Sequence, residues 1–160
     1  MRGMERTGHP EAEAWHEAGH AVVARLLGGR VVWISLEDDS DEHDGRAAIE
    51  WRPRNERELA SLSGRAALGG PLAELLHRGD DSLQDPEVLA AWVDDEREVE
   101  RCAKIVEPDG ERRVALIRRW LEEVRAIVEQ PDVEERIARV ADALDAHGTL
   151  DETLFEDCLA

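Results

Sequence analysis

The residues best suited to chemistry lie near the N-terminus, where His16, Glu17 and His20 form the pattern H-E-x-x-H. On an α-helix four residues turn the chain through about 400°, so the two imidazoles project from one face, about 6 Å apart along the axis. Two imidazoles at this spacing can bind one Zn²⁺ through their ring nitrogens. Zinc lowers the pKa of a coordinated water to about 7, and a neighbouring carboxylate such as Glu17 can accept the proton. The pattern therefore predicts a metallopeptidase-type site.

The residues around this pattern point in the same direction. Small residues occupy positions 18, 19 and 21, where another backbone or a metal ion can approach the helix closely. Gly19 costs about 1 kcal/mol of helix propensity relative to Ala, so its presence inside a helix requires a structural reason. The string HEAGHAVVARLLGG, which starts at His16, resembles the zinc-binding helix of peptidase family M41, the protease domain of FtsH-type ATP-dependent zinc proteases.

The resemblance implies a zinc metalloendopeptidase with Zn²⁺ as its cofactor. His16 and His20 would be metal ligands and Glu17 the catalytic general base. A second segment, residues 68–74 (LGGPLAE), resembles the small-residue stretch with an A-G-x-A-A-E pattern that occurs later in M41 domains. Its small residues suit close packing against the zinc helix, and Glu74 could be a hydrogen-bond partner of a ligand histidine.

Catalytic zinc typically takes three protein ligands, so one ligand remains to be identified. In M41 domains the third ligand is an aspartate near the start of a later helix, followed at four and eight positions by small apolar residues that pack on the zinc helix. Asp95 matches this pattern best, because Val99 and Ala103 follow it. Three other aspartates stay open as alternatives, first Asp85 and then Asp94 and Asp81. The S-x-D-L motif usual in the family does not occur around any of them.

Composition limits the partners and the location of the protein. The 160 residues suffice for a single domain, residues 1–160, with a substantial core. A net charge of -18 argues against nucleic acid and against anionic membrane surfaces as partners. No apolar run approaches the ~20 residues of a membrane span, and the N-terminal segment lacks the apolar core of a signal peptide. With Cys102 and Cys158 too few for a disulfide framework, we expect a cytoplasmic protein.

The first elements of the chain must position the H-E-x-x-H pattern. We expect a helix from Pro10 to the glycine pair at 28–29, followed by strands at 31–36 and 47–51 that form a small hairpin or short sheet. In M41 domains a strand in this place borders the substrate cleft, where an extended peptide could add as another strand. We expect Trp33 and Trp51 to be cross-strand partners in the core.

The rest of the chain is predicted to be helical from Glu56 onward. Gly69-Gly70-Pro71 should break or kink the first of these helices. Further helices are expected over residues 89–106, 111–130 and 133–147, with a capped short helix in the tail at 149–154. The predicted fold class is therefore mainly α with a small β-hairpin or sheet (α+β). The resemblance implies an FtsH peptidase-domain-like helical bundle built around a zincin-type helix.

The expected function is zinc-dependent hydrolysis of peptide bonds. The sequence has no P-loop, so we expect a stand-alone peptidase domain whose substrates are peptides or unfolded proteins. The acidic surface would favour basic or neutral substrates. M41 domains form hexamers in their parent proteases, so a homo-oligomer is possible. Two alternatives are a catalytically silent metal-binding or regulatory module that retains the FtsH peptidase fold, and a regulator-cleaving peptidase like the phage- and stress-associated enzymes with H-E-x-x-H.

Overall fold

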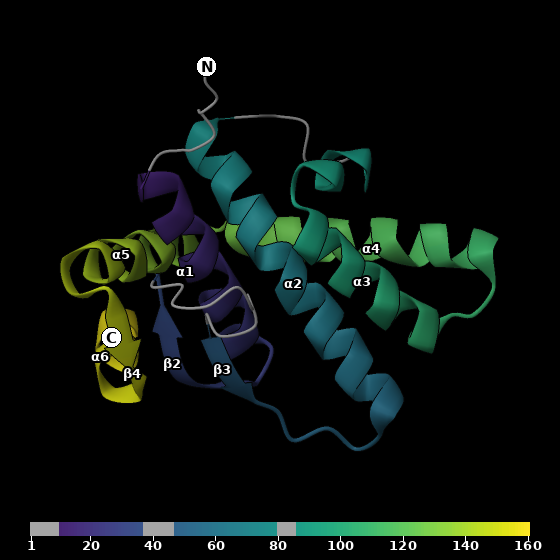
Figure 1. Cartoon of the computed structure of the whole chain (residues 1–160), viewed down its shortest axis with the longest axis horizontal. Coiled ribbons are helices and arrows are strands. Elements are labelled where there is room, and N and C mark those ends of the chain that lie inside the picture. The colour runs from purple at the N-terminus through teal and green to yellow at the C-terminus, as the bar shows by residue number, and fades with distance from the viewer. Residues whose placement is uncertain (1–9, 37–46, 80–85) are drawn as a thin grey trace.

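The computed structural model describes residues 10–36, 47–79 and 86–160 and is mainly helical, with a small three-stranded antiparallel sheet (Figure 1). The helices are α1 (Pro10–Leu26), α2 (Glu56–Arg78), α3 (Val93–Val106), α4 (Gly110–Val128), α5 (Pro131–His147) and α6 (Glu152–Leu159), with a 3₁₀ helix, η3 (Pro86–Ala91), before α3. The strands are β2 (Arg30–Ser35), β3 (Ala47–Glu50) and β4 (Thr149–Asp151). The predicted α+β class is confirmed.

The sheet has the order β3-β2-β4, so the central strand pairs with a neighbour from each end of the chain. The antiparallel pairing of β2 with β3 was expected, but β4 was not, since the tail from residue 149 was predicted to be helical. The hydroxyl oxygens of Ser35 and Thr149 lie 2.7 Å apart along this additional pairing, and Leu150 is fully buried. The expected capped helix begins only at Glu152, where the Asp151 side chain accepts a hydrogen bond from the Leu154 N–H.

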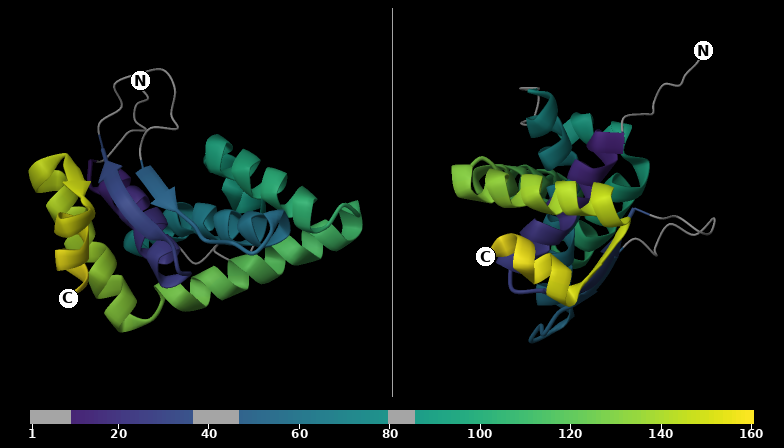
Figure 2. Two further views of the ribbon diagram at one scale, coloured as in Figure 1. Left: turned by 90° about the horizontal axis from the view of Figure 1, so that it is seen from below. Right: turned by 90° about the vertical axis from the view of Figure 1, so that its left-hand side faces the viewer.

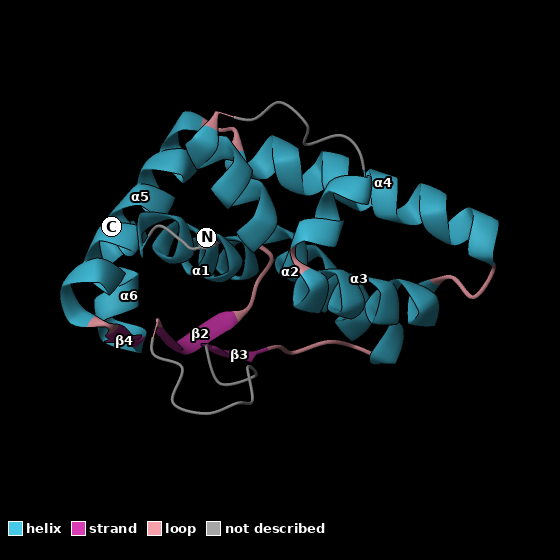
Figure 3. Ribbon diagram, turned by 45° about the horizontal axis from the view of Figure 1, so that its top comes forward, coloured by secondary structure: helices cyan, strands magenta, loops and turns pink. Residues whose placement is uncertain are grey.

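The two tryptophans of the strand region are not the cross-strand partners that the sequence predicted. Trp33 stands opposite Ala48 on β3 and Asp151 on β4, while Trp51 lies beyond the end of β3. The register shifts between Val31 and Trp33, which moves the later residues of β2 by one position relative to β3. Figure 3 shows the strands together at one edge of the molecule, with helices filling most of the rest.

Helix α1 packs against α2 so closely that their backbones touch at two glycines, and the two helices lie side by side in Figure 1. A Cβ added to Gly19 would collide with the carbonyl oxygen of Gly69, and one added to Gly69 would lie 2.6 Å from the carbonyl oxygen of Gly19. Ala18 and Ala21 of α1 are fully buried. The expectation that small residues let another backbone approach this helix is confirmed.

Of the break or kink predicted at Gly69-Gly70-Pro71, the break was wrong, because α2 continues through this segment and is 23 residues long. Pro71 removes one backbone hydrogen bond from the helix interior. Leu68, Leu72 and Ala73 on either side of it are fully buried, and burial of about 25 cal/mol per Å² of apolar surface offsets that loss. The continuous helix places residues at four-residue spacing on one face: Ala66, Gly70, Glu74 and Arg78.

Helix α3 returns along α2 and begins at Val93 rather than near Leu89 as predicted, since residues 86–91 form η3. Its middle packs on α2, where Cys102 lies close to Gly64 and Ala103 is fully buried. Helices α4 and α5 spread apart from the turn that joins them (Figure 2). Among the described residues, no helix has the combination of length and apolar character needed to cross a bilayer.

Candidate metal centre

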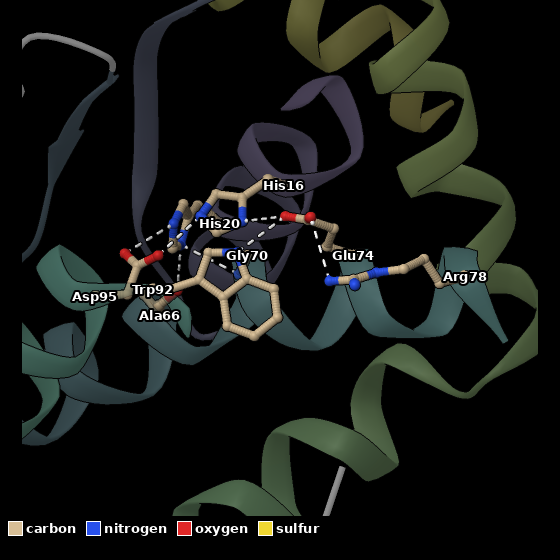
Figure 4. Close-up of polar contacts among 8 residues, drawn as sticks. All are labelled: His16, His20, Ala66, Gly70, Glu74, Arg78, Trp92 and Asp95. Carbon is tan, nitrogen blue, oxygen red and sulfur yellow. Dashed lines mark hydrogen bonds and ion pairs between the residues drawn. The ribbon is translucent and has the colours of Figure 1, made fainter. Parts of the chain in front are cut away.

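Three side chains predicted as metal ligands come together between α1 and α3 (Figure 4). The Nε2 atom of His16 lies 2.8 Å from Oδ2 of Asp95, and the Nε2 atom of His20 lies 3.2 Å from Oδ1 of the same carboxylate. One ligand atom from each of the three residues falls within 4.8 Å of the others. The centres of the two imidazole rings are 4.7 Å apart and the rings are nearly perpendicular, so both can bind the same metal ion.

Asp95 belongs to this cluster because of its place in the first turn of α3. Val99 and Ala103, which follow it at four and eight positions, are buried at 1% and 0% exposure, so this is the face that packs inward. Asp94 is exposed to solvent and makes no contact with the histidines. The other two alternatives, Asp85 and Asp81, lie outside the described residues.

The outer nitrogen of each ring is held by α2, which orients the inner nitrogen toward Asp95. Nδ1 of His16 lies 2.9 Å from Oε1 of Glu74, and because a carboxylate only accepts, this nitrogen carries a proton. Nδ1 of His20 donates to the carbonyl oxygen of Ala66 at 3.0 Å. With Nδ1 held in this way, each Nε2 atom can bind a metal once its own proton has left. The predicted contact of Glu74 with a motif histidine is confirmed.

Gly70 leaves room for an ion beside the two inner nitrogens. A Cβ added at this position would lie 2.5 Å from Nε2 of His20 and 2.7 Å from Nε2 of His16. Zinc binds imidazole nitrogen at about 2.0–2.1 Å, so the space that a side chain would fill is next to the place a shared ion would take. Two imidazoles and one carboxylate also form a donor set that zinc accepts. The residues of this cluster therefore fit a zinc ion.

The electrostatics of the cluster favour protonated histidines beside an ionised carboxylate. Burial lowers the pKa of His16, but its hydrogen bonds to Asp95 and Glu74 raise it more, to about 9. Burial likewise lowers the pKa of His20, and the charge of Asp95 raises it above its ordinary value. Burial raises the pKa of Asp95, yet the neighbouring charge of His20 brings it well below its usual range. A cation is therefore stabilised here, and a metal ion would compete with protons for the same place.

Glu17, the predicted general base, follows His16 on α1 and is only 8% exposed. Its charge is a minor contribution that raises the pKa of both His16 and His20. Glu17 does not belong to the group of candidate ligands. A carboxylate beside a metal site that does not bind the metal is suited to accept a proton from a reacting water.

The sequence-based prediction did not identify two residues of this region. The indole Nε1 of Trp92 donates to Oε1 of Glu74 at 3.1 Å, and Nη2 of Arg78 lies 3.5 Å from the other carboxylate oxygen, Oε2. If α2 is taken as one continuous helix, the four-residue spacing of Gly70, Glu74 and Arg78 places Arg78 on the same face, so the sequence could have indicated Arg78. Nothing in the sequence indicated Trp92, which precedes α3 as its N-cap residue.

We expect zinc binding to depend on Asp95 and not on its neighbour. Asp95→Ala removes one of three candidate ligands and should weaken zinc binding by at least about 100-fold, the upper range seen for outer-sphere changes. Asp94→Ala is the matched control on the same helical turn and should bind zinc like the wild type. Metal analysis after purification gives the zinc content of both variants, and competition with a chromophoric chelator gives their zinc affinities. Equal affinities for the two variants would exclude Asp95 as a ligand.

Zinc binding should release protons. With a pKa of about 9, His16 is protonated at neutral pH, and the proton on Nε2 must leave before this atom can bind a metal. The apparent zinc affinity should therefore increase about tenfold per pH unit for each proton displaced, from neutral pH up to about 9. Calorimetric titration at one pH in buffers of different ionisation enthalpy counts the protons. A binding enthalpy independent of the buffer would contradict this expectation.

No model of a known protein family matches this chain, and no curated protein matches it.

Proposed function

We propose that the protein is a zinc-dependent metalloendopeptidase with an FtsH peptidase-domain-like helical bundle, similar to family M41. The observation that carries this proposal is the convergence of His16, His20 and Asp95 beside Gly70. The resemblance of the H-E-x-x-H helix to the zinc helix of M41 supports it, as does Glu17 next to the first ligand.

The residues have separate tasks in this reaction. His16 and His20 would hold zinc through Nε2, and Asp95 through a carboxylate oxygen. When bound, zinc supplies a Lewis acid that polarises the scissile carbonyl and stabilises the charge that develops on its oxygen. Glu17 accepts the proton of the attacking water at its carboxylate and returns it to the leaving amine nitrogen. Glu74 keeps the ring of His16 in the tautomer that the metal requires.

The substrates in this proposal are peptides or unfolded protein segments. The net charge of -18 would attract basic or neutral peptides and repel acidic ones. A cytoplasmic location is part of the proposal, because both cysteines are free thiols, as is usual in a reducing compartment.

Cleavage of a flexible casein-like substrate tests the proposal. The protein is stripped with a chelator, reloaded with about one equivalent of zinc and assayed in each state. We expect cleavage by the zinc-loaded protein, its loss on stripping and its return on reloading. Zinc binding without cleavage of any peptide would favour the alternative, a metal-binding regulatory module that retains this fold.

A further inference from the structure

The first turn of α3, which carries Asp95, follows the buried Leu89 of η3 and the half-buried Trp92, whose backbone N–H donates to the Leu89 carbonyl oxygen at 2.8 Å. Trp92 is the N-cap residue, and its side chain makes no capping bond to the helix. Val93 is 50% exposed and Asp94 is exposed, so neither anchors the turn. The first buried residue of the helix is Val99, more than one turn later. Between the buried Leu89 and Val99, the position of Asp95 therefore depends in part on how the Trp92 side chain is held.

Trp92 is fixed by the same carboxylate that orients His16. Oε1 of Glu74 accepts a hydrogen bond from Nδ1 of His16 at 2.9 Å and from the indole Nε1 of Trp92 at 3.1 Å (Figure 4). The ring of Trp92 lies 6.2 Å from the ring of His16. One oxygen atom thus joins the zinc helix α1 to the residue that starts α3, with α2 providing the link.

Arg78 supports this arrangement from the next turn of α2. Its guanidinium lies 5.6 Å from the centre of the Trp92 ring and within 3.5 Å of Oε2 of Glu74. Arg78 is half exposed, so each of these contacts contributes little by itself. Together they hold the indole and the carboxylate in one place.

We propose that Trp92 is a positioning residue of the metal centre, which sets the distance between Asp95 and the two histidines by tying the start of α3 to Glu74. The inference rests on the proposed metal centre but not on peptidase activity. Asp95 follows Trp92 by three residues, about 4.5 Å along the helix axis, so a displacement of Trp92 moves Asp95 with it. Loss of the indole N–H also releases Glu74 to move away from His16. Both changes weaken the binding of zinc.

Trp92→Phe tests this role, because it removes the indole N–H and keeps an aromatic ring under Arg78. Trp51→Phe is the matched control, since Trp51 is also half buried but lies against Gly29, beyond the C-terminal end of α1. We expect zinc affinity, measured by chelator competition, to fall about 10–100-fold in Trp92→Phe and to stay unchanged in Trp51→Phe. Thermal unfolding in the presence of EDTA checks that both variants are folded.

A double-mutant cycle separates positioning through Glu74 from a general loss of packing. In a Glu74→Ala background the Trp92→Phe change should cost no further zinc affinity, because the carboxylate through which Trp92 acts is gone. Visible absorption of the cobalt-substituted protein, which reports the ligand geometry, should change in Trp92→Phe and not in Trp51→Phe.

Each outcome has a defined meaning. Equal zinc affinity for wild type and Trp92→Phe, or fully additive losses in the cycle, would overturn the role of Trp92 alone. A folded wild type that takes up no zinc would overturn the metal centre and this inference with it. Weaker zinc binding in Trp92→Phe, in a protein that cleaves no peptide, would support this inference and overturn the peptidase function.

Discussion

Replacing Glu17 by Gln should lower kcat/KM for peptide hydrolysis by about 10²–10⁴-fold and leave zinc bound. The amide has the size of the carboxyl group but cannot accept a proton from the attacking water. Glu17 is only 8% exposed, and an isosteric change avoids leaving a cavity at this position. Because Glu17 is not among the candidate ligands, the zinc content should remain at that of the wild type.

Glu13→Gln provides the control for this change, since Glu13 lies one turn earlier on the same helix and is exposed to solvent. It removes the same charge from α1 without touching the metal centre, so its activity should match that of the wild type. Cleavage of a fluorogenic peptide and metal analysis of the same samples measure both properties. Full activity in Glu17→Gln would remove this residue from the mechanism.

Gly70→Ala should abolish stoichiometric zinc binding. The added methyl group would lie 2.5 and 2.7 Å from the two Nε2 atoms, so both histidines must shift. Such distances are well inside normal van der Waals contact, and the backbone of α2 cannot yield, because Gly69 already touches α1. The substitution therefore displaces two ligands together, and zinc affinity should decrease by more than about 100-fold.

Gly110→Ala is the control for Gly70→Ala, because the nearest atom to an added Cβ there is Nη2 of Arg113 at 3.9 Å. This variant should keep full zinc binding and a wild-type unfolding temperature. Both proteins are compared by metal analysis and by thermal unfolding with and without zinc. Stabilisation by zinc should be present in Gly110→Ala and missing in Gly70→Ala. Undiminished zinc binding by Gly70→Ala would show that the ion does not bind between these nitrogens.

The sequence was most informative where the geometry is local. His16 and His20 share a face of α1 because the helical period alone decides it, and the glycine stop after Leu26 follows from local backbone preference. Gly19 signalled a close backbone approach without revealing that its partner is Gly69. The M41 resemblance favoured Asp95 as the third candidate ligand, because Val99 and Ala103 follow it at the spacing found in that family, and both residues are buried in the structure.

The sequence was least informative where distant segments compete or cooperate. Strand β4 forms only because β2 offers an unpaired edge to residues more than a hundred positions later, which no local preference of Thr149 or Leu150 reveals. The glycines and proline at 69–71 predicted a break or kink, but burial on both sides of Pro71 keeps α2 helical.

By itself, then, the sequence determined the helix that carries the H-E-x-x-H pattern, the helical character of the chain and the inward face of α3, since each depends on residues a few positions apart. Tertiary structure decided how these parts meet. It keeps α2 continuous, so that Gly70 lies beside both histidines and Glu74 contacts His16, and it joins Trp92 to the same carboxylate. These contacts connect residues 18 to 58 positions apart, and their distances follow from the packing of α1, α2 and α3 as a unit.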